Sequence, residues 1–450
     1  MLGAAMIALF VGSVAPRVES RQAAPAPQAT FRSVVDVIAV DVQVVDSNGR
    51  PMAALSPNQF SVTVDGRNRR VVSAELIEHS DRSAVAGPVR PIGSGPTATN
   101  LWPTTGEGRT FIIAFDASSL EAGEALPVVN ALRDFLNRLS PADRVGVFSL
   151  RTGSSQIDPS TDRAAVRRAL DALAGQKQSL PGQFNLSTSE IIDIASETAG
   201  FSMFAGSSAP TSSAPATGRA GTPPTIVAAP AATDSNTMQR VANRECRRTT
   251  DLGCIEAIFS EASALSHYLE DRATQTLNGI TDLLRALGEY PGRKTVIVMS
   301  GGIATSDRPG GRLDIGSEAR LLGEQAAHAN AVVYAVHVDT NLGENFSAQQ
   351  RRVRESTSLE RERRIESRVL DEFSSASGGT LLTALVGPGD IALDRVLRET
   401  SAFYLLGVEP ADMDRDGRTH KLSVKVNVKG ATIRSRNWVV LRKPTATPSR

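Results

Sequence analysis

The chain has 450 residues, about three times the usual size of one domain, so we expect two or more packed units. Its 49 Lys and Arg residues nearly balance its 48 Asp and Glu residues, which argues against a nucleic-acid binder that neutralises many phosphates. Five His and two Cys residues are too few for a Cys/His-rich zinc scaffold or a dense disulfide framework. After the first fifteen residues, no apolar run approaches the roughly 20 residues that a transmembrane helix needs, so we expect no membrane span in the mature chain.

The beginning of the chain predicts export. Residues 1–15 are apolar and small and residues 23–29 are rich in Ala, Pro and Gln, which is typical of a secretory signal peptide and its cleavage zone within residues 1–30. No Lys or Arg precedes the apolar run, so a disordered or buried N-terminal segment is the alternative. We expect a periplasmic or extracellular protein, in which an oxidising compartment favours a local disulfide between Cys246 and Cys254. Two separate buried thiols are the alternative.

Residues 31–82 predict a small antiparallel β unit. Apolar residues alternate with other residues in three short stretches, and Asp41 and Gln43 stand between the valines of the first stretch. The stretches are separated by turn sequences that contain Asn-Gly and Asp-Gly. A linker rich in Pro, Gly, Ser and Thr follows at residues 83–108.

Residues 109–400 predict a doubly wound, mostly parallel α/β sheet, because strand and helix patterns alternate there. The expected elements are buried strands at 110–115, 144–150, 295–299 and 332–338, and helices at 126–139, 162–173, 255–287 and 317–329. A segment of mainly Ala, Ser, Thr, Pro and Gly at 205–236 predicts a disordered insertion. A charge-dense helix at 349–369 is interpreted as a solvated surface.

Residues 401–442 return to an alternating pattern that predicts at least three strands. About three strands make only a marginal sheet, whereas six or more can bury a common face. We therefore expect the N-terminal and C-terminal strands to pair into one small β-sandwich, with the α/β domain inserted between them.

The ordered set FIIAFDASS, DRVGVFSL, GRKTVIVMSGG, VVYAVHVDT and SASGGTLL resembles a von Willebrand factor type A (VWA) domain. Over residues 31–442, including the flanking β patterns, the chain resembles a bacterial VWFA-related subfamily. The resemblance implies a Rossmann-like fold and a role in protein–protein interaction or adhesion. It also implies a Mg²⁺ or Mn²⁺ site built from an Asp-x-Ser-x-Ser loop, a Thr on a second loop and an Asp on a third, since hard divalent ions prefer oxygen ligands.

The match to that metal site is incomplete. Asp116 and Ser118 correspond to the first Asp and the first Ser, and Thr188 is a candidate for the second-loop Thr. Leu120 stands at the second Ser position and Gly301 at the third-loop Asp, and neither side chain supplies an oxygen ligand. The alternative is that Asp116 and Ser118 form loop hydrogen bonds and cap the following helix.

Three functions follow as hypotheses. The first is a non-enzymatic, exported protein that presents loops at Ser118–Ser119 and Ser300–Gly302 to a protein partner, with a degenerate metal site and no cofactor. The second is a divalent-metal-dependent adhesion module that uses Asp116 and Ser118. The third is a hydrolase or phosphate-handling enzyme on a doubly wound sheet, against which stands the lack of any readable nucleophile–base pair. The sequence leaves the partner and the oligomeric state open.

Overall fold

The computed structural model describes residues 37–79, 108–150, 155–178, 182–205, 236–248, 251–307, 311–340, 356–385 and 391–441. The predicted signal peptide and leader lie outside these ranges, as do almost all of the predicted linker and insertion. Within the described ranges, no helix combines the length and the apolar character that a bilayer crossing requires.

A six-stranded sheet forms the centre of the molecule, in the order β10-β9-β8-β5-β6-β7. Its strands are β5 (Thr110–Phe115), β6 (Arg144–Ser149), β7 (Ser155–Ser160), β8 (Lys294–Ser300), β9 (Ala331–Asp339) and β10 (Thr380–Leu385). All pairs are parallel except β6 with β7, which is antiparallel. The central strands are buried along nearly their whole length, which explains why their sequences are continuous apolar runs.

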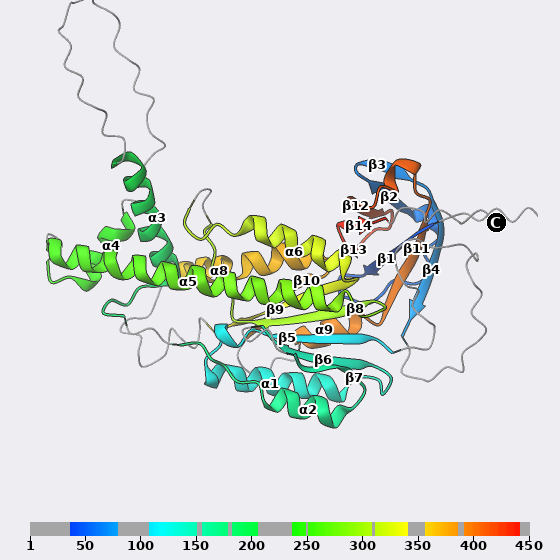
Figure 1. The fold of residues 1–450 in the computed structure, drawn as a ribbon, viewed down its shortest axis with the longest axis horizontal. Helices are drawn as coiled ribbons and strands as arrows, with labels where there is room; N and C mark the ends of the chain where they lie inside the picture. Colours follow the sequence, from blue (N-terminus) through cyan, green and yellow to red (C-terminus); the bar gives the residue numbers. More distant parts are fainter. Residues whose placement is uncertain are drawn as a thin grey trace, which may run out of the picture.

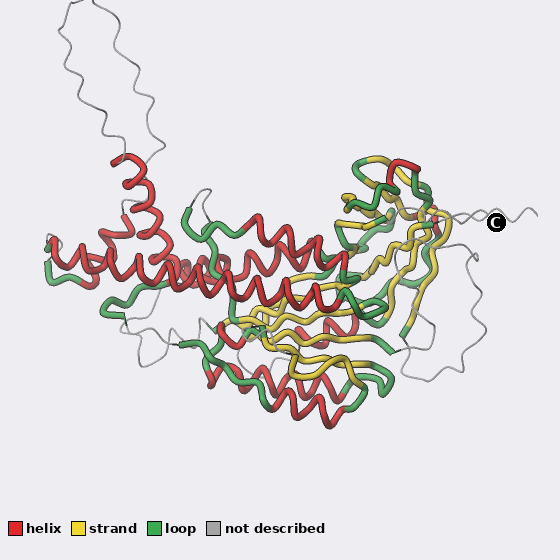
Figure 2. The backbone as a smooth tube through the Cα atoms, viewed as in Figure 1, coloured by secondary structure: helices red, strands yellow, loops and turns green. Residues whose placement is uncertain are grey.

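Helices cover both faces of this sheet (Figures 1 and 2). The helices of the described ranges are α1 (Ala122–Asn137), α2 (Arg163–Asp171), α3 (Thr188–Ala205), α4 (Asn236–Glu245), α5 (Leu252–Leu287), α6 (Gly316–His328), α8 (Ser356–Ala376) and α9 (Ile391–Glu399). Helices α1, α2 and α9 pack on one face around residues such as Phe111 and Leu132. Helices α5, α6 and α8 pack on the other face around residues such as Ile112 and Leu284.

Helices α3 and α4 and the first half of α5 form a lobe that extends beyond the carboxyl ends of the strands, on the left in Figure 1. The lobe has its own small core, which includes Ile194, Val241 and Ile258. A disulfide between Cys246 and Cys254 joins the end of α4 to the start of α5, so the predicted pairing of these cysteines is confirmed.

The two ends of the chain pair into two four-stranded antiparallel sheets, in the orders β13-β1-β11-β4 and β14-β12-β2-β3. The strands are β1 (Ile38–Val45), β2 (Phe60–Val64), β3 (Arg67–Arg69), β4 (Val71–Glu78), β11 (Ala402–Val408), β12 (Thr419–Val426), β13 (Thr432–Ser435) and β14 (Trp438–Val440). β1 lies between β11 and β13, and β2 pairs with β12. Side chains from both sheets, including Val42, Val62 and Leu406, share one core.

The polar residues of β1 face the α/β domain and are buried, although their alternation with valines is typical of a solvated sheet face. Asp41 forms ion pairs with Arg436 and Arg293, and the Tyr334 hydroxyl donates to Gln43 over 2.9 Å. Burial alone would raise the pKa of Asp41, but the two arginines outweigh it and hold the pKa below its ordinary value. Charged contacts therefore join the sandwich to the amino end of the central sheet.

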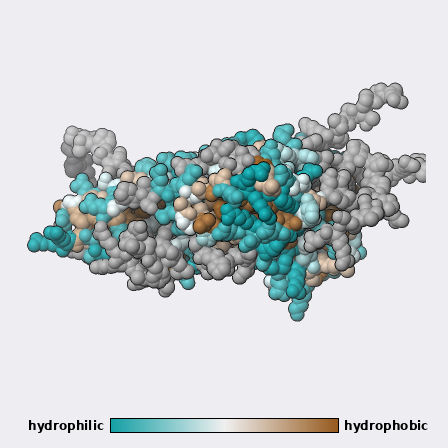
Figure 3. All heavy atoms as spheres, turned by 90° about the horizontal axis from the view of Figure 1, so that it is seen from below, coloured by the Kyte–Doolittle hydropathy of each residue, from teal (hydrophilic) through white to brown (hydrophobic). Residues whose placement is uncertain are grey.

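The surface seen from below carries hydrophobic patches on either side of a hydrophilic band (Figure 3). The coloured residues of this face therefore do not form one continuous apolar surface.

Candidate functional site

A row of polar residues follows the carboxyl ends of three neighbouring strands. Asp116 comes directly after β5, and its N–H donates to the carbonyl of Met299 in β8 over 2.9 Å. Ser300 ends β8 and lies opposite His337 of β9 in the parallel register. Ligands of open α/β sheets bind beyond this edge, so the row is the first place to search for a site.

The Asp116 carboxylate is buried, with 1% of the residue exposed, and both of its oxygens accept hydrogen bonds from hydroxyl groups. Ser118 donates to Oδ1 over 2.7 Å, and Ser300 donates to Oδ2 over 2.8 Å. A third, longer contact of 3.4 Å runs from the Thr276 hydroxyl to Oδ1. Three hydroxyl donors therefore satisfy the hydrogen-bonding capacity of this buried carboxylate.

Helix α5 carries Thr276 into this cluster because it packs closely against the end of β6. A Cβ atom on Gly279, one turn later, would lie only 2.2 Å from the carbonyl oxygen of Leu150. A residue without a side chain is therefore needed there for α5 to approach this far. Nothing in the sequence indicated that Thr276 belongs to this cluster, since it lies on a long helix 160 residues away from Asp116 along the chain.

Ser119 connects the loops that follow β5 and β8. Its hydroxyl donates to the Asp116 carbonyl over 2.9 Å and accepts the Gly301 N–H over 2.7 Å. A Cβ atom on Gly301 would lie 2.4 Å from the Ser119 carbonyl oxygen, far inside normal contact distance. The position expected to carry the third-loop Asp therefore has no room for any side chain in this arrangement.

Leu120, at the second Ser position, is fully buried in the core between the sheet and helices α1 and α2. Its side chain thus belongs to the hydrophobic core of the domain. Asp116 also does not cap a helix through its side chain, because α1 begins after Glu121, whose own capping box is present. The alternative interpretation was that Asp116 and Ser118 form loop hydrogen bonds and cap the following helix. The structure shows the loop hydrogen bonds but no cap from the Asp116 side chain.

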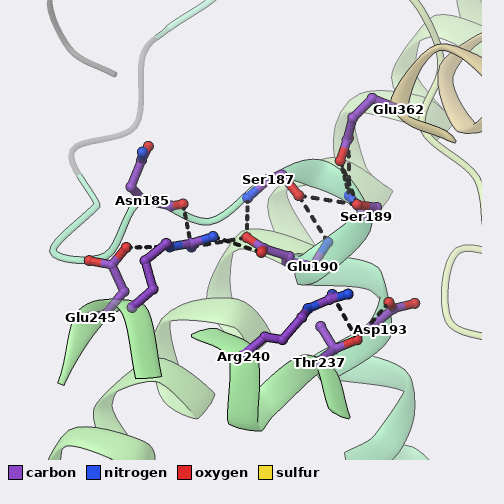
Figure 4. A network of polar contacts seen from close by, with 10 residues as sticks. Asn185, Ser187, Ser189, Glu190, Asp193, Thr237, Arg240, Glu245 and Glu362 are labelled. Atoms are coloured by element: carbon purple, nitrogen blue, oxygen red, sulfur yellow. Dashed lines mark hydrogen bonds and ion pairs between the residues drawn. The ribbon is translucent and has the colours of Figure 1, made fainter. Parts of the chain in front are cut away.

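Thr188, the candidate for the second-loop Thr, is the first residue of α3 and is half-buried. Next to it, Ser189 donates its N–H and its hydroxyl to Glu362 of α8, with 2.5 Å between Oγ and Oε1 (Figure 4). Glu190 pairs with Arg244 of α4 over 2.8 Å. Figure 4 shows this network at the base of the lobe, where Glu362 is almost completely buried.

The structure therefore brings Asp116 and Ser118 together, whereas Thr188 stands at the start of α3, outside the hydrogen bonds described around Asp116. The donors to the Asp116 carboxylate are Ser118, Thr276 and Ser300. Within the described ranges, no group of three or more His, Cys, Asp and Glu side chains is arranged to hold a metal ion. With a single carboxylate, a core residue at position 120 and no space at position 301, these residues do not fit the implied Mg²⁺ or Mn²⁺ site.

The charge-dense helix is solvated on one side only, at Glu360, Arg364 and Arg368, which corrects the interpretation made from its sequence. Residues 349–355 of the predicted helix lie outside the described residues. Arg361 of α8 forms ion pairs with Asp193 of α3 over 2.8 Å and with Asp307 over 3.0 Å. These hydrogen bonds raise the pKa of the Arg361 guanidinium. Arg363 pairs with the buried Asp339 over 2.6 Å. The charges of α8 therefore tie the lobe and the strand-end loops together.

His337 is completely buried beside this cluster, and neither ring nitrogen has a hydrogen-bond partner that meets normal geometry. The nearest carboxylate oxygen, from Glu366, lies 3.9 Å from Nε2. Burial lowers the pKa of His337, because the charged imidazolium loses its solvation, although nearby Asp339 acts in the opposite direction. Burial of His337 therefore favours the neutral imidazole over the charged form.

The strand-end loops that were expected to face outward are largely buried. Ser118, Ser119, Ser300 and Gly302 are all buried, and Gly301 is half-buried. Helix α5 contributes to this cover through Thr276, and the side chain of Glu366 on α8 lies against Gly302. Residues 174–178 form a more exposed rim next to them.

No protein-family model matches this chain, and no curated protein sequence matches it. Two solved structures are similar to it at 8% sequence identity. One is the VWA domain of SpRpn10, with a TM-score of 0.26, covering 65% of this chain and 96% of that chain. The other is proximal thread matrix protein 1 (PTMP1) from the mussel byssus with a zinc-occupied MIDAS motif, with a TM-score of 0.17, covering 68% and 99%. TM-scores of this size carry no argument about this protein.

Proposed function

We propose that this chain is an exported, non-enzymatic protein of VWA type that binds a protein partner, for adhesion or another interaction, without a divalent metal. The observation that carries the proposal is the state of Asp116. Its buried carboxylate already accepts hydrogen bonds from Ser118 and Ser300 at 2.7 and 2.8 Å, and the Thr276 hydroxyl makes a longer contact of 3.4 Å with it. A buried carboxylate that is satisfied by neutral donors has a structural role in this loop without an ion.

Two neighbouring positions support the same proposal. Leu120 fills the hydrophobic core, and the backbone of Gly301 lies against the Ser119 carbonyl. A metal-bridged contact would need an oxygen ligand at each of these two positions. In this chain both positions serve packing instead.

The non-enzymatic part of the proposal rests on Ser300 and His337. Ser300 directs its hydroxyl to Asp116 and also contacts the Ser119 hydroxyl over 3.3 Å. His337 is fully buried and makes no hydrogen bond of normal geometry to that serine. A hydrolase would need a nucleophile and a base in contact, in a place that substrate can reach.

Export is supported by the disulfide between Cys246 and Cys254, because such bonds form and persist mainly in oxidising compartments. The disulfide stabilises the corner between α4 and α5.

For the contact surface we propose the rim at residues 174–178. Gln176 donates its N–H to the Ala117 carbonyl over 2.7 Å, and Lys177 donates to the Leu120 carbonyl over 2.9 Å. These bonds fix the rim to the buried loop, while Gln176 and Gln178 are exposed. A rigid, exposed loop held by a sheet is a common place for a partner contact.

The metal-free proposal is tested by calorimetric titration of the protein with Mg²⁺, Mn²⁺ and Ca²⁺ beside Asp116→Ala. We expect no binding heat in either protein and no change of melting temperature on adding EDTA. Heat in the wild type that disappears in Asp116→Ala would overturn the proposal. The metal-dependent adhesion module that uses Asp116 and Ser118 would then be the better function.

The rim is tested by using the immobilised protein to capture partners from an extracellular fraction. The variant is Gln176→Glu with Gln178→Glu, and the control is Glu75→Gln on the exposed part of β4. We expect proteins that the wild type and the control retain and the rim variant does not. Equal capture by all three would exclude the rim as the contact surface.

A further inference from the structure

Four polar residues form a row across the carboxyl edge of the central sheet, on the face that α5, α6 and α8 cover. In the register of the sheet, Ser300 of β8 lies opposite His337 of β9, which lies opposite Thr383 of β10. Asp116 continues the row after β5 and accepts the Ser300 hydroxyl. The row before it on the same face is apolar and belongs to the core beneath these helices, as at Ala335.

The imidazole of His337 is buried in this row without a hydrogen-bond partner. None of its surface is exposed, and among the described residues neither ring nitrogen has a partner of normal geometry. Buried polar side chains are nearly always hydrogen-bonded, and an unpaired one costs free energy in the folded state. The cost is greater for the imidazolium, which gives up more hydration and has two N–H donors to place. This position therefore tolerates the neutral ring and opposes its protonation.

The charged groups around the ring do not offset this cost. Asp339, two residues later on β9, is buried, and its carboxylate is paired with Arg363 of α8 over 2.6 Å. Glu366 of α8 has a carboxylate oxygen 3.9 Å from Nε2, beyond hydrogen-bond distance. Burial, the largest cause, lowers the pKa of His337, and Arg363 acts in the same direction. Asp339 and the backbone of Gly301 act against them without reversing the shift.

Helix α8 closes over this row, and it holds the loop after β8 directly beside the His337 ring. The Ile303 N–H donates to the Glu366 carbonyl over 2.9 Å. A Cβ atom on Gly302 would lie only 2.6 Å from the Cβ atom of Glu366, so helix and loop are in close contact. β9 is paired on both sides in the sheet, so α8 is the element that can move away from the ring.

We propose that His337 is an acid-sensitive latch, a side chain that lets α8 lie closed on the strand-end edge when its ring is neutral and releases α8 when its ring is protonated. The direction follows from proton linkage. In an open state the hydrated ring binds a proton with a pKa near the ordinary 6.5, whereas the closed state binds it less readily. The closed state is therefore fully favoured above pH 6.5 and loses this advantage as the pH falls. The open population rises about tenfold for each pH unit until the closed state is itself protonated.

Opening would change access to the edge of the sheet. Residues 302–306 are buried when α8 is closed, and Ser300 and Ser118 are buried next to them. Movement of α8 would expose this loop, so the latch makes access to the edge depend on pH. This inference does not rest on the proposed function, and the two can fail separately.

Other groups that titrate near this range act elsewhere in the chain. Between pH 7 and pH 5.5, ordinary Asp and Glu side chains stay largely ionised, because their pKa values lie near 4. The pKa of His420 is raised, so its protonation stabilises the β-sandwich as the pH falls. Burial lowers the pKa of His79 to about 4, but this residue follows β4 and its ring lies near Phe403 of β11. The latch is therefore distinguished by where the change occurs.

Hydrogen–deuterium exchange of the full chain at pH 7.0 and pH 5.5, corrected for the intrinsic exchange rates, tests the proposal. We expect the protection of amides in residues 360–374 of α8 to fall about tenfold, because about one proton is taken up on opening over this range. Amides of β5, in the centre of the sheet, should keep their protection. A wild type in which α8 keeps its protection, or loses it only as much as β5 does, would overturn the proposal.

Two variants assign the change to His337. His337→Phe keeps a ring of similar size and His337→Gln keeps a polar side chain, and neither side chain titrates. We expect α8 to be equally protected at the two pH values in each variant that folds. His79→Gln is the matched control, since it removes another buried histidine with a lowered pKa, and it should keep the tenfold fall in α8. A His337 variant that folds and keeps the fall would overturn the proposal.

Discussion

The loss of metal ligands in the Asp116 loop leads to a prediction about rebuilding them. Leu120→Ser and Gly301→Asp together restore the residue types that the VWA resemblance implies at these positions. We predict that this double variant is strongly destabilised and gains no useful metal site. The reason is that both positions are used for packing, one by a core side chain and the other by a close backbone contact.

The size of the effect follows from the two environments. Leu120 is fully buried, and truncating a buried leucine costs about 2–5 kcal/mol. At Gly301, any Cβ atom meets the Ser119 carbonyl oxygen at 2.4 Å, and relieving such overpacking costs about 1–3 kcal/mol. Domains are typically stable by only about 5–15 kcal/mol, so the double variant should lose a large part of its stability.

Metal binding would not compensate for this loss of stability. A ligand at one hundred times its dissociation constant stabilises the folded state by about 2.7 kcal/mol. This gain is smaller than the loss expected from Leu120 and Gly301 together, even if a site formed.

Urea denaturation measures the free energy of unfolding of the wild type, each single variant and the double variant, with excess Mg²⁺ or with EDTA. Leu126→Ser is the matched control, since this leucine lies on α1 with 59% of its surface exposed, and it should change the free energy by less than about 0.5 kcal/mol. A double variant as stable as the wild type would refute the packing argument. A double variant that Mg²⁺ restores to wild-type stability would refute it equally.

Two further predictions concern charges outside the candidate site. Asp41→Ala should lower the free energy of unfolding by about 3–5 kcal/mol, because it leaves buried arginines without their counter-charge. Urea denaturation measures this loss, with Glu75→Ala at an exposed position as the control. Equal losses of stability in the two variants would contradict the role of the buried ion pairs. For His420, burial acts to lower the pKa, but hydrogen bonds to Asp65 and Asp416 outweigh it and raise the pKa above the ordinary 6.5. The stabilisation is then complete below pH 6.5 and is lost as the pH rises through the folded-state pKa. The stability advantage of the wild type over His420→Gln should therefore shrink between pH 6 and pH 9, and a constant difference would exclude this protonation.

Local patterns in the sequence predicted most elements of the central sheet correctly. Strands such as β5 and β8 are buried on both faces, so their apolar runs can be recognised without knowing their neighbours. Neither edge strand was among the predicted ones: β7 pairs only with β6 and its sequence, SQIDPS, contains no apolar run, and the short β10 pairs only with β9. Strands at the edge of a sheet carry less of the pattern that periodicity detects.

Patterns of polar residues were less informative, since the same pattern occurs on faces that contact water and on faces that another part of the protein covers. Asp41 and Gln43 alternate with valines as on a solvated strand, but the α/β domain covers them. Arg361 and Arg363 similarly stand on a charge-dense helix and are paired with carboxylates of other elements. An ionic side chain can be buried when a partner is supplied, and that partner is remote in the sequence.

The sequence by itself determined that Asp116 and Ser118 share one loop and that Leu120 and Gly301 bring no oxygen ligand. It also contained the two cysteines of the disulfide at a spacing that allowed them to be paired. Only the tertiary structure decided what surrounds the carboxylate, because Thr276 and Ser300 reach it from 160 and 184 residues away. The physical reason is that a hydrogen bond depends on distance and direction within a few ångströms, and the packing of α5 and β8 around β5 sets both.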